Sequence, residues 1–130
     1  MEQVEVVRDI YEAFGRGDVP AILEHLSEDV AWESWADNHA QRAGVPWLAS
    51  QSGHAGVAEF FAAVGQMGVT RFEVLNLLAG ADAVAAEIEI DTARFNDQEM
   101  HLWTFGDDGK VVRFRHYTDT AKHIAGAAIG

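Results

Sequence analysis

Residues 99–119 read EMHLWTFGDDGKVVRFRHYTD, and this stretch decides the fold. The polar tetrapeptide at 107–110 contains Asp-Gly and separates two runs rich in aromatic and β-branched residues, which predicts a β-hairpin with strands over 99–105 and 111–119. Side chains alternate across a strand, so the two strands present these rows on single faces: His101, Trp103 and Phe105, then Phe114, His116 and Thr118.

Two further strands precede the hairpin. Residues 72–79 form one strand-like run. In the next strand, the apolar positions 84, 86, 88 and 90 alternate with Ala85, Glu87, Glu89 and Asp91. Glu87 and Glu89 are the paired carboxylates of that second strand. They either face a cavity, where one could carry a raised pKa, or face water; we expect water.

The N-terminal half is mainly helical. Apolar residues recur at helical spacing before Gly15 and again over 57–67, and Asp18 is a suitable N-cap for a short second helix that contains Pro20. A strand is expected over 30–35, after a turn at Ser27–Asp29. The order of helices and strands predicts an α+β fold, in which a curved mixed or antiparallel sheet wraps three N-terminal helices as a cone. The small residues 125–130 are expected to fray.

Composition narrows the function classes. The chain has 130 residues, which predicts one domain over 1–130, and 9 basic against 21 acidic residues give a net charge of −12. Such acidity argues against binding to nucleic-acid phosphates or anionic membranes. There is no cysteine, no secretory signal and no apolar run near the roughly 20 residues that span a bilayer, so a cytoplasmic location is expected.

Residues 37–52 have no clear periodicity. A long irregular loop in a small domain is usually functional, and this one could act as a lid over the mouth of the cone. Trp35 and Trp47 lie beside or within this segment. We therefore expect both tryptophans to line a pocket.

Six motifs in this order resemble one family. The sequence resembles the nuclear transport factor 2-like superfamily, in its SnoaL-like and ketosteroid isomerase-like branch. The matching stretches are Tyr11-Glu-Ala-Phe14 with Gly17-Asp18, Leu26-Ser-Glu-Asp29-Val-Ala-Trp32, Gly53-His-Ala-Gly56-Val-Ala-Glu-Phe60-Phe61, His101-Leu-Trp103-Thr-Phe105, Asp108-Gly109-Lys110-Val111 and Arg113-Phe-Arg115-His-Tyr117-Thr-Asp119-Thr120.

This resemblance implies a cystatin-like cone with an apolar pocket, often dimeric through the outer face of the sheet. Relatives include ketosteroid isomerases, polyketide cyclases, limonene epoxide hydrolases, dehydratases and pure binding proteins. The fold therefore does not select the reaction.

The resemblance singles out two histidines. His101 falls about where ketosteroid isomerases carry the aspartic acid of the oxyanion hole, and an imidazole there could donate a hydrogen bond to an enolate. His116 falls where limonene epoxide hydrolases carry a pocket carboxylate, and could act as a general base. The alternatives are a polar residue on a strand face for His101 and a pocket-lining residue for His116.

Two groups of a ketosteroid isomerase are missing. Ser34 occupies the position of the catalytic base, and a serine does not take a carbon-bound proton unaided. Ile10 occupies the position of the tyrosine, while Tyr11 lies about 100° further round the helix. Ketosteroid isomerisation is therefore not expected. Asp119 is expected to cap the turn that follows its strand.

The sequence thus predicts a domain that binds a small hydrophobic (cyclic) molecule and acts as a cofactor-free isomerase, cyclase or dehydratase, with His101 and His116 as catalytic residues. A non-catalytic binding protein or dimeric interaction protein is the alternative. No motif predicts a metal, a nucleotide or another cofactor. The expected pocket walls are Trp32, Ser34, Trp35, Trp47, Phe61, Trp103 and Phe114.

Overall fold

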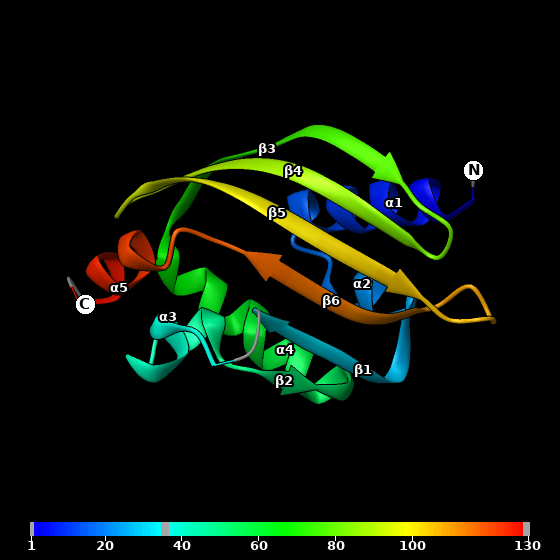
Figure 1. Cartoon of the computed structure of the whole chain (residues 1–130), viewed down its shortest axis with the longest axis horizontal. Helices are drawn as coiled ribbons and strands as arrows, with labels where there is room; N and C mark the ends of the chain where they lie inside the picture. Colours follow the sequence, from blue (N-terminus) through cyan, green and yellow to red (C-terminus); the bar gives the residue numbers. More distant parts are fainter. Residues whose placement is uncertain (1, 35–36, 129–130) are drawn as a thin grey trace.

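A computed structural model describes residues 2–34 and 37–128. In it, one six-stranded sheet with the order β2-β1-β6-β5-β4-β3 bends over the helices (Figure 1). The elements in chain order are α1 (Glu2–Arg16), α2 (Val19–Leu23), β1 (Leu26–Ser34), α3 (His39–Arg42), the 3-10 turn η1 (Pro46–Leu48), β2 (Gln51–Ser52), α4 (Gly53–Val64), the 3-10 turn η2 (Gly65–Met67), β3 (Val69–Ala79), β4 (Ala83–Thr92), β5 (Asn96–Phe105), β6 (Val111–Tyr117) and α5 (Thr120–Ala128).

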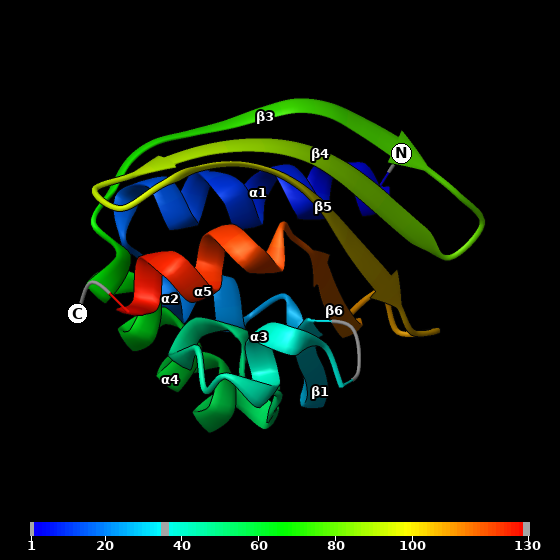
Figure 2. The ribbon, with the colours of Figure 1, turned by 60° about the vertical axis from the view of Figure 1, so that its left-hand side comes forward.

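The sheet is mixed, as the α+β prediction allowed. β3, β4, β5 and β6 pair antiparallel, β1 runs parallel to β6, and the short β2 pairs antiparallel with β1. Figure 2 shows β3, β4 and β5 arching over α1, with α3, α4 and α5 further beneath. The curved sheet and the helices therefore enclose a common interior, and the predicted fold class is confirmed.

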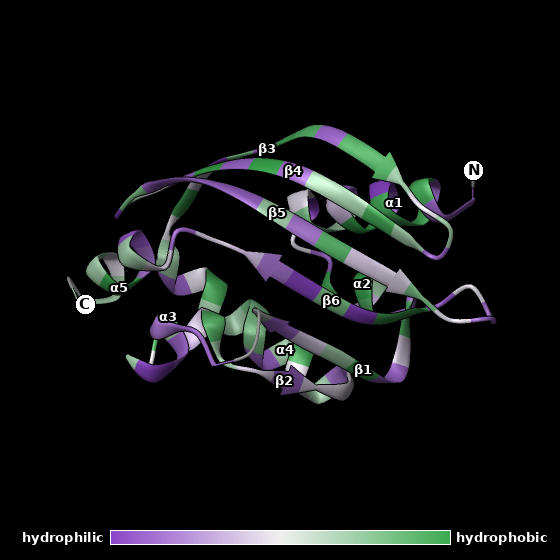
Figure 3. Ribbon diagram, viewed as in Figure 1, coloured by the Kyte–Doolittle hydropathy of each residue, from purple (hydrophilic) through white to green (hydrophobic). Residues whose placement is uncertain are grey.

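The alternation expected in β4 is present. Hydrophilic and hydrophobic residues alternate along this strand (Figure 3), with Ile88 and Ile90 buried in the interior. Glu87 is exposed and Glu89 pairs with Arg71 at the surface, so both glutamates face outward as expected. The inner face of the sheet is consequently apolar at this strand.

The predicted helix boundaries follow local chemistry. Asp18 caps α2 and accepts a hydrogen bond from the backbone N–H of Ala21 at 3.2 Å, with Pro20 in the first turn. After α4 and η2, Gly68 adopts a left-handed conformation at φ 67° that redirects the chain into β3. None of the helices among the described residues is long and apolar enough to cross a bilayer.

The stretch 37–52 is more ordered than the sequence indicated. It folds into α3, η1 and β2, and the side chain of Asn38 caps α3 by accepting from the backbone N–H of Gln41 at 3.0 Å. Trp47 and Leu48 are buried in the core. The prediction of an irregular loop is therefore wrong, because short helical turns place these apolar side chains inward without a regular period.

Two boundary predictions are also wrong. β1 starts at Leu26, so Ser27–Asp29 belong to a strand with a bulge before Ala31 rather than to a turn. The C-terminal residues form α5 up to Ala128 instead of fraying from Ala125. Asp119 accepts from the backbone N–H of Lys122 at 3.4 Å and so does cap that turn.

Close packing of α5 gives a stability prediction. A Cβ at Gly126 would lie 2.6 Å from Cδ2 of Phe95, so the Gly126→Ala variant must displace that ring, and we expect a loss of about 1–3 kcal/mol in unfolding free energy. Gly15 in α1 has open space around it, and Gly15→Ala should stabilise by about 0.5–1 kcal/mol. Urea denaturation measures both; an unchanged Gly126→Ala variant would contradict this packing.

Candidate functional site

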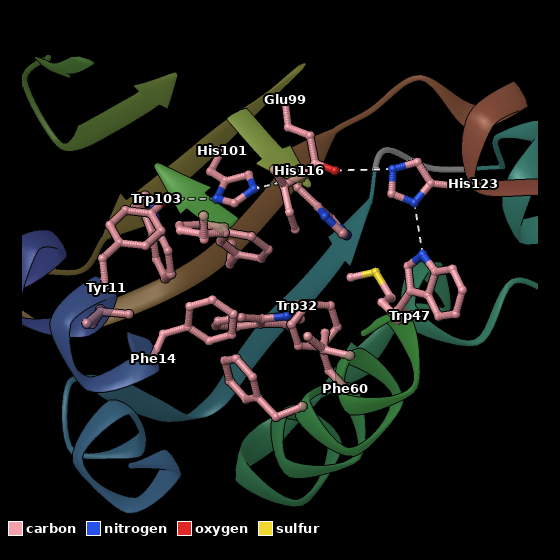
Figure 4. A pocket seen from close by; sticks show the side chains of 17 residues that line it. Tyr11, Phe14, Trp32, Trp47, Phe60, Glu99, His101, Trp103, His116 and His123 are labelled. Carbon is pink, nitrogen blue, oxygen red and sulfur yellow. Dashed lines mark hydrogen bonds and ion pairs between the residues drawn. The ribbon is translucent and has the colours of Figure 1, made fainter. Parts of the chain in front are cut away.

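An internal cavity of about 60 Å³ lies between the helices and the inner face of the sheet (Figure 4). Most of its wall is aromatic, and one carboxylate and three imidazoles interrupt that wall: Glu99, His101, His116 and His123. The structure places five of the predicted wall residues here, namely Trp32, Trp47, Phe61, Trp103 and Phe114. Ser34 pairs with His116 in the sheet register, although its side chain, like all of Trp35, lies outside the described residues.

One hydrogen-bond chain runs from α1 into β5. The hydroxyl of Tyr11 lies 2.7 Å from Nδ1 of His101, and Nε1 of Trp103 donates to the same hydroxyl at 3.0 Å. Nε2 of His101 lies 3.1 Å from Oε1 of Glu99. Both ring nitrogens of His101 are therefore engaged, so His101 has no free N–H for a ligand in this arrangement.

A second chain reaches the same carboxylate from α5. Nε1 of Trp47 donates to Nδ1 of His123 at 2.8 Å. Nε2 of His123 lies 3.1 Å from Oε2 of Glu99 and 2.7 Å from Oδ2 of Asp97. Glu99 thus receives one imidazole on each of its two oxygens, and both histidines are nearly or fully buried.

The two indoles set the direction of every bond in these chains. An indole N–H only donates, so Trp47 requires an unprotonated Nδ1 on His123 and leaves its proton on Nε2, facing the carboxylates. Because Trp103 donates to the Tyr11 oxygen, the Tyr11 proton has Nδ1 of His101 as its acceptor. We infer from these partners that both imidazoles are neutral and donate to Glu99.

The pKa shifts of Glu99 and Tyr11 agree with these assignments of hydrogen-bond donors and acceptors. Burial by itself raises the pKa of Glu99, but the hydrogen bonds from His101 and His123 outweigh burial and hold the pKa well below its usual value. Burial raises the pKa of Tyr11 far above its usual value, although the Trp103 hydrogen bond opposes this. Glu99 is consequently a carboxylate, and Tyr11 keeps its proton.

His123 is under opposing influences. Burial lowers its pKa, yet the hydrogen bonds to Asp97 and Glu99 outweigh burial and raise it. The N–H of Trp47 acts against protonation, since a protonated Nδ1 would meet a second donor at 2.8 Å. The observed contact is a hydrogen bond only while His123 is neutral.

His116 differs from the other two histidines. It forms no side-chain hydrogen bond to another described residue, and its ring contacts Phe60, Phe114 and His101 at centroid distances of 5.8, 5.3 and 5.9 Å. Burial lowers the pKa of His116 to about 3, because the carboxylate of Glu99 compensates only in part. His116 is therefore a neutral imidazole with hydrogen-bonding capacity to spare on the cavity wall.

A second polar atom of the wall is also unsatisfied. Nε1 of Trp32 is buried and has no hydrogen-bond partner among the described residues. Trp32 stacks on Phe114 with ring centroids 4.2 Å apart, so packing fixes its indole. A buried donor without a partner costs about 1–3 kcal/mol, which a ligand acceptor would recover.

Two groups of side chains have the spacing of metal ligands: Glu99 with His101 and His116, and Asp97 with Glu99 and His123. The donor directions oppose a metal at both. A histidine that binds a metal through Nε2 carries its proton on Nδ1, where Trp47 places a donor against His123. At His101 the same change would leave the Tyr11 hydroxyl without its acceptor. These residues suit a hydrogen-bonded carboxylate better than a cation.

Sequence reasoning missed four of these polar residues: Tyr11, Asp97, Glu99 and His123. Tyr11 was considered only as lying about 100° round the helix from the ketosteroid isomerase tyrosine position at Ile10, whereas Ile10 and Tyr11 both line the cavity. Asp97 and Glu99 share the inner face of β5 with His101, which the alternation of that strand could have indicated. Nothing in the local sequence points to His123, because α5 was not expected.

Comparisons with known proteins agree with this fold. The family model of the SnoaL-like domain matches residues 7–114. TerC, co-crystallised with polyporic acid, is 25% identical, with 97% of this chain and 98% of that chain covered at a TM-score of 0.78. An NTF2-like protein of unknown function from Burkholderia pseudomallei K96243 is 23% identical over 95% of each chain, with a TM-score of 0.76.

A protein with a cystatin-like fold from Silicibacter pomeroyi DSS-3 is 18% identical, with 95% of this chain and 80% of that chain covered at a TM-score of 0.74. A comparison with curated proteins finds no significant match. Of the three solved structures named above, the two that are less than 25% identical to this chain show the fold alone.

The opposing influences on His123 predict the effect of Trp47→Phe. This variant removes the N–H that keeps Nδ1 unprotonated, so we expect the pKa of His123 to rise further. Histidine-selective NMR titration measures it. Trp32→Phe is the matched control, because it removes an indole N–H that has no described partner and should leave His123 unchanged. An unaltered His123 titration in Trp47→Phe would contradict the inferred tautomer.

The buried His116 predicts a pH dependence of stability. Its pKa is about 3 in the folded protein, so below about pH 6.5 the unfolded chain takes up a proton that the folded chain does not. Stability must therefore fall as the pH drops towards 3. His116→Phe should reduce this slope by about 1.4 kcal/mol per pH unit between pH 4.5 and 6, while the exposed His39→Gln control keeps it. Equal slopes in all three proteins would refute a neutral His116.

Proposed function

The chain belongs to the SnoaL-like domain family, and from that premise we propose that it binds a small, neutral, hydrophobic molecule with a ring and a hydrogen-bonding oxygen. The observation that carries the proposal is the neutral His116, which has no described partner in an otherwise aromatic cavity. The oxygen of the ligand would meet His116 and the unpartnered N–H of Trp32. The ring would contact Trp103 and Phe114.

Both polar atoms match an oxygen. A neutral imidazole donates at one nitrogen and accepts at the other, whereas an indole N–H only donates. A ligand hydroxyl or carbonyl can accept from either group, and a hydroxyl can in addition donate to His116. Burial of a ring among aromatic side chains supplies the main driving force, at roughly 25 cal/mol per Å² of apolar surface.

Charge favours a neutral ligand. Glu99 is a buried carboxylate on the wall, and the chain carries a net charge of −12. An anion would approach against this field and would then lie close to Glu99. The co-crystal structure of TerC with polyporic acid supports a small-molecule role for this fold.

A second candidate function is cofactor-free acid–base catalysis, such as isomerisation, cyclisation or dehydration. It is favoured by one observation, the chain of hydrogen bonds from Tyr11 through His101 to Glu99. In this arrangement the carboxylate orients His101, and His101 orients the Tyr11 hydroxyl. For Tyr11 to donate a proton to a ligand oxygen, its hydroxyl must turn away from Nδ1 of His101, and His116 would then be the proton acceptor.

We propose separately that the chain forms a homodimer through the outer face of the sheet. Several apolar side chains stand exposed on the outer face of the sheet: Leu75, Leu78, Met100, Val112 and Tyr117. A second copy of the chain would cover them. This association leaves the cavity on the inner face unchanged.

Phenol is the simplest probe of the proposed function, since it has one ring and one hydroxyl. His116→Phe keeps an aromatic ring but loses the hydrogen bond, so we expect phenol to bind roughly tenfold more weakly, and Trp32→Phe to weaken binding roughly threefold. The His39→Gln variant is the control and should match the wild type. Ligand-observed NMR titration gives the dissociation constants; phenol binding that is identical in all four proteins would refute the proposed site.

A further inference from the structure

A second hollow, of about 460 Å³, opens at the surface where the end of α1, the start of α2 and the end of α4 meet. Its lining consists only of apolar side chains and glycines, among them Val19, Ile22, Gly65 and Val69. No charged or hydrogen-bonding side chain takes part, which is unusual on the surface of a chain with a charge of −12.

This hollow shares part of its wall with the inner cavity. Phe14, Phe61 and Val64 line both spaces. The rings of Phe14 and Phe61 are in contact, with centroids 5.9 Å apart, and both side chains are half-buried. Side chains therefore form the partition between the two spaces, and rotamer changes of these rings would connect them without movement of the backbone.

Figure 4 shows Tyr11 and Trp103 on the same side of the inner cavity as Phe14, Trp47 with His123 on the opposite side, and His116 between them. A ligand whose oxygen meets His116 can therefore direct the rest of its ring away from His123, towards Phe14 and Phe61. At about 60 Å³ the inner cavity is smaller than the roughly 150 Å³ of a cavity that holds benzene, so a ring enters only if side chains of the wall move, and any larger apolar part needs the outer hollow.

We propose that the hollow is a second subsite for the same ligand, which defines the ligand class as a hydroxylated ring with an uncharged apolar substituent of several carbons. The inference rests on the proposed function of the inner cavity. The ring would occupy the inner cavity, and the substituent would pass between Phe14 and Phe61 into the hollow. No charged side chain lines the hollow to pair with a charge on this substituent, so an uncharged substituent fits it best.

The test compares phenol, 4-propylphenol and 4-hexylphenol on the full chain and on Gly65→Trp. A Cβ at Gly65 meets nothing within 4 Å, so the new indole can project into the hollow. Gly15→Trp is the matched control, since Gly15 also has open space around it but does not line the hollow. Dissociation constants come from calorimetry, and thermal denaturation verifies that all variants fold.

In the wild type and in Gly15→Trp, each carbon of the chain should tighten binding roughly twofold, less than the roughly fourfold of full burial because the hollow is open to solvent, so that 4-hexylphenol binds on the order of a hundredfold more tightly than phenol. In Gly65→Trp the affinity for phenol should stay the same, and the gain from the chain should fall to less than about threefold.

Phenol binding without any gain from the longer chains would overturn the second subsite and leave the proposed function standing. The second subsite would also be overturned if the alkyl chain increased the affinity equally in Gly65→Trp and Gly15→Trp. Failure of all three probes to bind would contradict both inferences. If Gly65→Trp instead abolished self-association in sedimentation experiments, the hollow would belong to an interface between two copies, and the subsite would be refuted.

Discussion

The buried carboxylate of Glu99 is the constraint on which the site depends. A carboxylate removed from water is stable only if its oxygens accept hydrogen bonds, and here each oxygen takes one from an imidazole. His101 brings in Tyr11 and thereby α1, while His123 brings in Trp47 and thereby α5 and η1. The Glu99 carboxylate on β5 is consequently linked through hydrogen bonds to α1, to η1 and to α5.

Donor-only groups make this network directional. Trp103 and Trp47 stand at its two outer ends, and neither can accept a hydrogen bond, so every proton between them and Glu99 points inwards. With neutral imidazoles every donor in this network has an acceptor, which explains how five aromatic or imidazole side chains are held around one acid. It also explains why His116, which lies outside it, is the histidine that remains available to a ligand.

The sequence predicted features that depend on neighbouring residues better than features that depend on contacts between distant residues. The hairpin at 107–110, the alternation in β4 and the cap at Asp18 are local, and each was predicted correctly because a few neighbouring residues determine them. Trp32, Trp103 and Phe114 were placed on the wall because alternation and family resemblance both applied. Tyr11 and His123 could not be placed in this way, since their roles depend on contacts across 90 residues for Tyr11 with His101 and 24 for His123 with Glu99.

The electrostatics of the cavity bear on which reactions it could support. Protonation of an imidazole with a pKa of about 3 at pH 7 costs roughly 5 kcal/mol, so His116 by itself is a weak base for a carbon-bound proton. An enolate would also place new negative charge near the carboxylate of Glu99, which Coulomb repulsion disfavours. Developing positive charge would be stabilised instead, both by Glu99 and by the faces of Trp103 and Phe114. If the cavity supports chemistry, its charge distribution therefore suits loss of a leaving hydroxyl through a cationic transition state better than isomerisation through an enolate.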